Sequence, residues 1–167
     1  MSTHAHSFEV KAGLECIPAF DIIGISTIVS NNETASEDIN ALWQRFFEEQ
    51  TAHRIEHRVD DVIYAVYSDY QGDHTKPYRF TIGYKVAANA AHVQGLDHVQ
   101  VQEADYAMMS AAGEQPKALV DVWTAIWQSD LDRCFSTDFE VYGKRFFEEG
   151  VHEVLVAIGV NIEKGTA

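Results

Sequence analysis

The chain has 167 residues, a length that suits one domain with a sizeable buried core, and no apolar run approaches the roughly 20 residues needed to span a bilayer. Its formal net charge of −14, from 26 acidic and 12 basic side chains, argues against a surface that follows nucleic-acid phosphates. Two widely separated cysteines, Cys16 and Cys134, and a start without a signal-peptide pattern lead us to expect a cytoplasmic protein with no disulfide framework.

The first half of the chain predicts a strand, a helix and a hairpin. The segment 20–29 is rich in β-branched residues, which favours a strand. Thr34 and Glu37 then match a capping box, which predicts the start of a helix. The expected elements are a strand over 20–29, a helix from 34 or 36 to about 50, and strands over 61–70 and 78–87 joined by a polar hairpin loop at 71–77.

The second half predicts the same kinds of element in the same order. Gly113 and Pro116 interrupt it, and Pro116 suits the first turn of a helix. Patterns typical of strands lie on both sides of that helix. The expected elements are a strand over 99–111, a helix from Pro116 to about Ser129, and strands over 139–142 and 153–162.

The two halves also repeat one another in detail. Both helices carry apolar residues at i, i+3, i+4, i+7 and i+8, and these are Ile39, Leu42, Trp43, Phe46, Phe47 and Leu119, Val122, Trp123, Ile126, Trp127. The strand motif 64–67 returns as 139–142, an offset of 139 − 64 = 75, and 80–83 returns as 156–159, an offset of 156 − 80 = 76. We therefore predict an α+β fold in which a strand-helix-strand-strand unit is duplicated about a pseudo-twofold axis. Because no linker divides the copies, we expect one domain over 1–167 with repeats at about 18–90 and 98–162.

The repeat breaks at Glu140, where the first copy has Ala65. Strand side chains alternate between faces, so Glu140 and Tyr142 share one face, and Tyr67 holds the matching position in the first copy. If the opposite, apolar face packs under the helices, these three side chains come together. A carboxylate among aromatic rings suits a delocalised organic cation. An exposed glutamate beside a half-buried tyrosine fits the pattern equally well.

The tryptophans of the helices have two possible roles. Trp43 and Trp123 lie on apolar stripes, where an aromatic residue is more often part of the core than a ligand contact. Trp123 is still kept as a candidate ligand-binding residue. Trp127, at the end of its stripe, could reach the rim of a groove.

Other polar residues give weaker signals. His53 and His57 are four residues apart, but no third metal ligand accompanies them, so a solvated helix end or loop is the better interpretation. Solvated turn roles are expected for Asp69 and Asp138. No glycine-rich phosphate loop and no nucleophile elbow are present, and we expect neither a metal nor a cofactor.

Several motifs together resemble the GyrI-like small-molecule-binding domain, which is also the effector-binding domain of AraC-type and multidrug-sensing MerR-type activators. They are Val-Tyr-Ser-Asp-Tyr at 66–70, the hairpin 77–83, the helix segment 122–127 and Thr-Asp-Phe-Glu-Val-Tyr at 137–142. The resemblance covers roughly Pro18 to Val160. It implies two SH2-like motifs with an antiparallel sheet and a central groove for amphipathic, often cationic drugs. It also matches Glu140 to the family's buried ligand-binding glutamate, and Glu153 to a second acid found in some multidrug sensors.

The resemblance is to the free-standing form of the domain, since fewer than twenty residues precede the first strand and leave no room for a helix-turn-helix. Our leading hypothesis is a non-enzymatic binding protein for amphipathic, cationic small molecules. The resemblance also implies an alternative, a hydrolase that opens strained cyclopropane rings of toxins, with Glu140 as a general base or a water-positioning group. Another is an acidic interaction module that engages a basic partner such as a topoisomerase.

Overall fold

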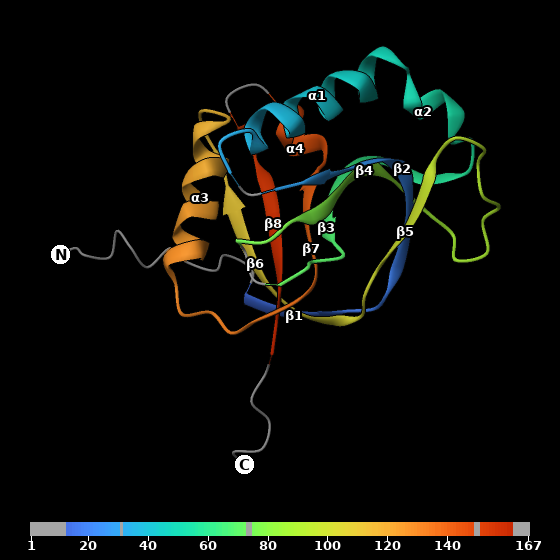
Figure 1. Ribbon diagram of the computed structural model, residues 1–167. Helices are drawn as coiled ribbons and strands as arrows, with labels where there is room; N and C mark the ends of the chain where they lie inside the picture. The colour runs from blue at the N-terminus through green and yellow to red at the C-terminus, as the bar shows by residue number, and fades with distance from the viewer. Residues whose placement is uncertain (1–12, 31, 73–74, 149–150, 162–167) are drawn as a thin grey trace.

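The computed structural model describes residues 13–30, 32–72, 75–148 and 151–161 (Figure 1). The strands are β1 (Gly13–Ile17), β2 (Phe20–Val29), β3 (Arg58–Ser68), β4 (Tyr78–Val86), β5 (Asp97–Val101), β6 (Ala104–Ala111), β7 (Arg133–Tyr142) and β8 (Val154–Val160). The helices are α1 (Ala35–Glu48), α2 (Thr51–Arg54), α3 (Lys117–Gln128) and α4 (Lys144–Phe147). Within the described residues, no helix is long and apolar enough to cross a membrane.

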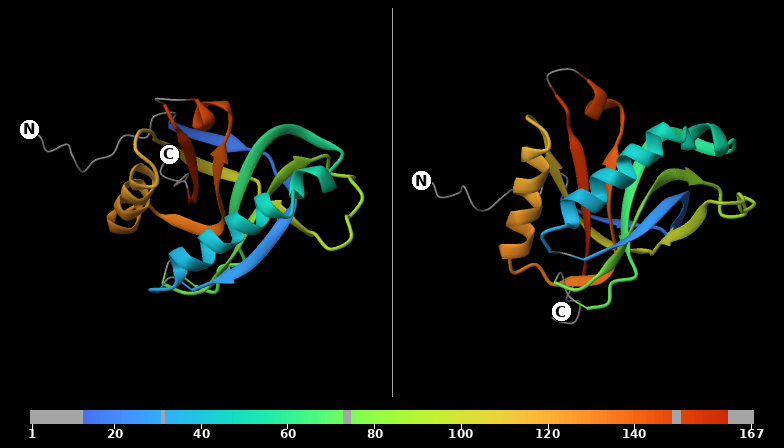
Figure 2. Two further views of the ribbon diagram at one scale, coloured as in Figure 1. Left: turned by 90° about the horizontal axis from the view of Figure 1, so that it is seen from above. Right: turned by 45° about the horizontal axis from the view of Figure 1, so that its top comes forward.

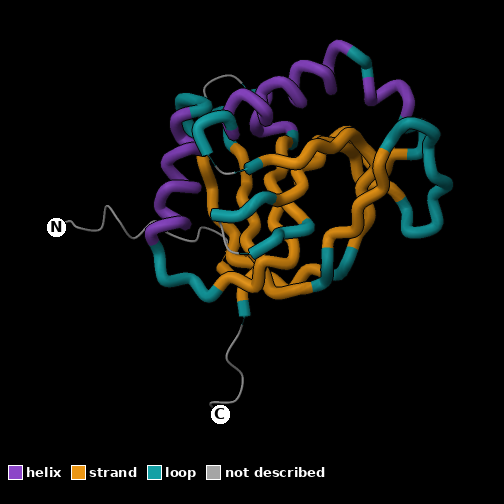
Figure 3. Tube along the Cα trace, in the orientation of Figure 1, coloured by secondary structure: helices purple, strands orange, loops and turns teal. Residues whose placement is uncertain are grey.

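All of these strands, which are orange in Figure 3, belong to one antiparallel sheet in the order β1-β6-β8-β7-β3-β4-β2-β5. The first half contributes β2-α1-β3-β4, the second contributes β6-α3-β7-β8, and the two halves meet at the central pair β3–β7. The two strands at the ends of this order exchange between the halves. Strand β1 pairs with β6 of the second half, and β5 pairs with β2 of the first half. The predicted α+β fold with a duplicated strand-helix-strand-strand unit is confirmed.

The register of the central pair places the repeat-equivalent residues Ala65 and Glu140 directly opposite each other. The two residues differ in their pairing with the next strand outward. Ala65 pairs with Ile82, and the 76-residue offset would therefore pair Glu140 with Ile158. Glu140 instead pairs with Val156. The second half is therefore shifted by two residues. Because strand side chains alternate with a period of two, this shift leaves every side chain on its original face.

Both long helices cover the same face of the sheet (Figure 2). Helix α1 contacts β2 and β4, and α3 contacts β6. Leu42 of α1 and Ile126 of α3 lie in one apolar core, which also holds Tyr67 and Tyr142. Glu140 shares the strand face of Tyr142, so its carboxylate lies beneath the helices.

The condition considered from the sequence, that the face of Phe139 and Val141 packs under the helices, does not hold. Phe139 instead lies on the helix-free face, 5.3 Å from the ring of Phe20 and 5.2 Å from that of Tyr106. The physical reason is the curvature of the sheet. Strand β5, at one end of the strand order, is followed after only two residues by β6 near the other end, so the sheet curls around a second core. Both faces are buried, and apolar character alone does not identify the helix-covered face.

Three local details also differ from expectation. The strand expected over 99–111 is divided into β5 and β6 by Gln102 and Glu103. Thr34 is the N-cap of α1 but makes no capping hydrogen bond, since its hydroxyl donates to Asn32 Oδ1 across 2.8 Å. Pro116 precedes α3 as its N-cap instead of lying inside the first turn.

Candidate ligand-binding site

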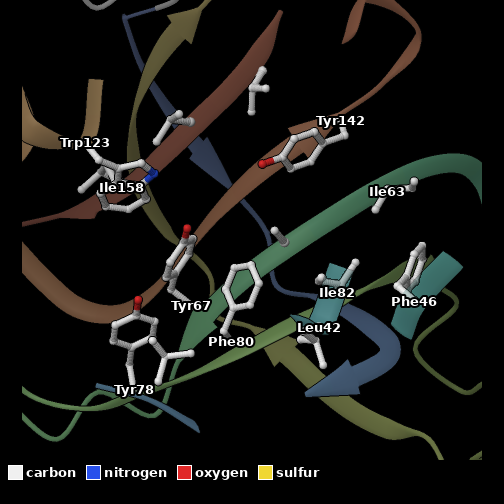
Figure 4. Packing of buried hydrophobic residues seen from close by; sticks show 14 of the residues in the cluster. Leu42, Phe46, Ile63, Tyr67, Tyr78, Phe80, Ile82, Trp123, Tyr142 and Ile158 are labelled. Carbon is white, nitrogen blue, oxygen red and sulfur yellow. The ribbon is translucent and has the colours of Figure 1, made fainter. Parts of the chain in front are cut away.

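Glu140 lies at the centre of the sheet on β7 and is only 1% exposed. Its cross-strand neighbour is the small residue Ala65, which leaves space on the helix-covered face for a longer side chain. The polar tips of Tyr67, Trp123 and Tyr142 converge on this space (Figure 4). They come from β3, α3 and β7, so both copies of the repeat contribute to the site.

Three neutral donors hold the Glu140 carboxylate. The Tyr67 hydroxyl and the Trp123 indole N–H donate to Oε2 across 2.6 Å and 2.8 Å. The Tyr142 hydroxyl donates to Oε1 across 2.6 Å. A carboxylate can accept about four hydrogen bonds, so the remaining capacity lies on Oε1. We call Glu140, Tyr67, Trp123 and Tyr142 the aromatic cage.

Burial controls the electrostatics of the cage. Desolvation raises the pKa of the Glu140 carboxyl, and the three hydrogen bonds lower it in part because they favour the charged form. Desolvation and the nearby carboxylate raise the pKa of Tyr67 and of Tyr142 well above the usual value, and the pKa of Tyr78 is raised to about 12. These phenols therefore remain hydrogen-bond donors at neutral pH.

Further rings extend the walls of the cage. The Tyr67 ring lies 4.9 Å from Trp123 and 5.4 Å from Tyr78, and the Tyr142 ring lies 4.9 Å from Trp43. Tyr78 was not predicted as a site residue, and Trp43 was assigned only to the core. The alternation of Tyr78 and Phe80 along one strand would have placed Tyr78 on the face of Tyr67. For Trp43, no signal in the sequence distinguishes a wall from ordinary core.

The outer candidates occupy different positions. Trp123 is buried, as its apolar stripe predicts, but it also donates a hydrogen bond to Glu140. Trp127 is 40% exposed, and its ring centre lies 6.3 Å from that of Trp123. Glu153 is not brought into the cage: it is hydrogen-bonded to Ser110 and forms an ion pair with Arg145 across 2.5 Å.

The prediction for Asp138 was wrong, because this residue is fully buried rather than solvated. Its Oδ2 pairs with Arg133 across 2.8 Å and accepts a hydrogen bond from Tyr70, and its Oδ1 accepts the Gly159 N–H across 2.8 Å. Burial raises the pKa of Asp138, and Arg133 opposes that rise. Asp69, by contrast, is exposed and pairs with Arg79 across 2.8 Å.

The aromatic cage is closed. Two surface concavities of about 570 and 460 Å³ lie elsewhere, one beside Val62 and Phe147, the other beside Phe20 and Tyr64 on the helix-free face. Neither of them includes Glu140. Glu140, Tyr67, Trp123 and Tyr142 are all buried, so a ligand must part the rings to reach the carboxylate.

The fold has close counterparts among solved structures. An integron cassette protein from the mobile metagenome of Vibrio cholerae is 22% identical, with a TM-score of 0.66 over 89% of this chain and 94% of that chain. SAV2435, solved with bound tetraphenylphosphonium, is 18% identical, with a TM-score of 0.71 over 92% of this chain and 93% of that chain. At these identities the similarity shows a shared fold. No curated protein sequence matches the chain.

The sequence itself identifies the family. The model of the integron-associated effector-binding proteins, Cass2, matches residues 14–158, which include the first copy of the repeat, most of the second copy and the whole aromatic cage. This match agrees with the resemblance to GyrI-like domains that the strand and helix motifs carry. The chain belongs to the Cass2 family of integron-associated effector-binding proteins.

Proposed function

We propose that this protein binds amphipathic organic cations in the aromatic cage. Glu140 supplies the counter-charge, Tyr67, Trp123 and Tyr142 form the walls, and Trp127 lies at the rim. The effector-binding family supports a small molecule as the ligand. The structurally similar protein that carries tetraphenylphosphonium supports an aromatic cation as its class.

The observation that carries the proposal is the contrast between the two buried acids of β7. Asp138 has a cationic partner, Arg133, within 2.8 Å. Glu140 is equally buried, yet its hydrogen bonds come from neutral groups alone, and no basic side chain among the described residues contributes to its pKa. An uncompensated buried carboxylate is expensive to desolvate. A cationic ligand would supply the missing charge, and the surrounding rings would add cation–π contacts.

The direct test compares a cation with a neutral molecule of nearly the same shape. Methyltriphenylphosphonium and triphenylphosphine oxide differ in one small substituent and in charge. We expect isothermal titration calorimetry to show binding of the phosphonium and clearly weaker binding of the oxide. Equal affinity for both molecules would indicate an apolar pocket that does not select for charge. Failure of the phosphonium to bind would contradict the proposal.

A further inference from the structure

Arg133, the first residue of β7, is a buried guanidinium with unused hydrogen-bond donors. Its side chain is only 6% exposed. Nη2 donates to Asp138 Oδ2 across 2.8 Å and to the Tyr70 hydroxyl across 3.4 Å. Nε and Nη1 are buried, and neither has a hydrogen-bond partner among the described residues. Buried donors are nearly always paired in folded proteins, so two unpaired donors on one charged group require an explanation.

Asp138 neutralises this guanidinium without satisfying it. The carboxylate gives one oxygen to Nη2 and Tyr70, and its other oxygen accepts the backbone N–H of Gly159. Both oxygens of Asp138 are therefore engaged, while Nε and Nη1 of Arg133 remain available. What this pair still lacks is a hydrogen-bond acceptor rather than a negative charge.

Aromatic rings hold the guanidinium in place. Its Cζ lies 4.3 Å from the ring centre of Phe135, 5.8 Å from that of Tyr70 and 5.9 Å from that of Trp123. Phe135 has a φ of +53°, in the left-handed region that bulky residues rarely adopt. A strained residue of this kind persists only where its surroundings fix it, and such residues cluster at ligand sites.

Arg133 and the aromatic cage share a wall. Trp123 donates its indole N–H to Glu140, and the same ring lies against the guanidinium. Tyr78, which lies beside Tyr67 in Figure 4, forms a second link, because its ring lies 5.4 Å from Tyr67 and 5.8 Å from Tyr70. One ligand that parts these rings would meet a carboxylate at the indole N–H of Trp123 and the unpaired Nε and Nη1 donors of Arg133 beside the same ring.

We propose that Arg133 forms an acceptor subsite beside the aromatic cage, so that the ligands of this protein are organic cations that also carry a carbonyl or carboxylate oxygen. The oxygen accepts a hydrogen bond from Nε or Nη1 of Arg133 while the cationic part lies against Glu140. This inference rests on the proposed function, because it places the second group of the same ligand.

The test uses three probes with one cationic head: pentyl-triphenylphosphonium, which has no acceptor, carboxybutyl-triphenylphosphonium, and the methyl ester of the latter. All three are titrated into the full chain by calorimetry at neutral pH. We expect the acid and the ester to bind on the order of tenfold more tightly than the pentyl probe, the scale of one hydrogen bond to a charged group. A gain for the acid alone would restrict the subsite to carboxylates. Equal binding of all three probes would overturn the inference while leaving the proposed function intact, whereas failure of all three to bind would contradict both.

A double variant tests whether Arg133 causes the tighter binding of the acid and the ester. The double change Arg133→Met with Asp138→Asn removes the donors without leaving a buried acid unpaired. We expect it to bring the three probes within about twofold of one another, and the ratio of their affinities, rather than the affinity for any one probe, is the readout. The matched control, Arg79→Met with Asp69→Asn, removes an exposed Arg–Asp pair and should keep the tenfold preference. If the buried double variant does not fold, Arg133→Lys is used and should reduce the preference. An equal loss for all three probes would show that Arg133 only shapes the cage.

Discussion

Glu140 lies directly opposite Ala65 in the central strand pair, so the two residues that the repeat aligns face each other across the pseudo-twofold axis. One side of the axis carries an acid and the other a methyl group. Directly opposed side chains in such a pair have Cβ atoms about 4.5–5.5 Å apart. A symmetric site with two acids would therefore force two buried carboxylates together, and the break in the repeat avoids this repulsion.

Restoring the symmetry should destabilise the protein in a pH-dependent manner. We expect Ala65→Glu to be less stable at neutral pH than Ala65→Gln, its neutral counterpart of similar size, by roughly 1–3 kcal/mol. The new carboxyl would have a raised pKa in the folded state, so folding would favour its protonated form. The difference between the variants should therefore shrink as the pH falls, when measured by urea denaturation. A difference that stays constant with pH would mean that shape, not charge, limits this position.

We expect the indole N–H of Trp123 to contribute more to the stability of the protein than its ring does. Trp123→Phe keeps an aromatic side chain but removes one of the three donors to Glu140. We expect a loss of about 1–3 kcal/mol in the free energy of unfolding, the scale of a hydrogen bond to a buried charged group. The control is Trp43→Phe, because the Trp43 ring packs edge-on against Tyr142 and no hydrogen bond joins it to Glu140 among the described contacts. Equal losses for the two variants would reduce Trp123 to a packing role.

The raised pKa of Glu140 gives stability a defined dependence on pH. The folded chain holds the Glu140 proton more tightly than the unfolded chain, so folding is favoured while this carboxyl is protonated. This contribution is fully present below the ordinary pKa of a glutamate and is lost as the pH rises through the raised value. The unfolding free energy of the wild type minus that of Glu140→Gln should therefore decrease with rising pH across this window. An increase over the same window would show that the hydrogen bonds outweigh desolvation.

Cation binding should release protons wherever the empty site is partly protonated. A ligand cation stabilises the ionised form of Glu140, so its affinity should strengthen as the pH rises through the raised pKa. Calorimetry with methyltriphenylphosphonium in buffers of different ionisation enthalpy measures the number of protons released. Net proton uptake would contradict the assignment of Glu140 as the counter-charge.

Much of the fold and part of the site could be predicted from the sequence. The helical spacing around Trp43 and Trp123 gives the helices, and strand alternation places Glu140 and Tyr142 on one face. Alternation does not tell which face the helices cover, because the curled sheet buries Phe139 as fully as Glu140. Apolar stripes likewise identify buried rings but not the hydrogen bond that one of them donates.

The Arg133–Asp138 pair shows a second limit of the sequence. These residues are five apart on one strand, a spacing that would put them on opposite faces of a regular strand. They meet because the pairing with β8 is irregular between them and Phe135 adopts a left-handed conformation. Such an irregularity depends on tertiary packing, and no local pattern in the sequence predicts it.

The measurement that tests the central claim most directly is the affinity of Glu140→Gln for the matched pair of probes. The amide oxygen can keep the hydrogen bonds made at Oε2, and the amide N–H₂ can donate to the Tyr142 hydroxyl, so the variant removes charge while preserving shape. We expect methyltriphenylphosphonium to bind more weakly by on the order of 1–3 kcal/mol and triphenylphosphine oxide to change little. An equal loss for both probes, or an unchanged affinity for the cation, would contradict the role of Glu140 as the group that selects charge.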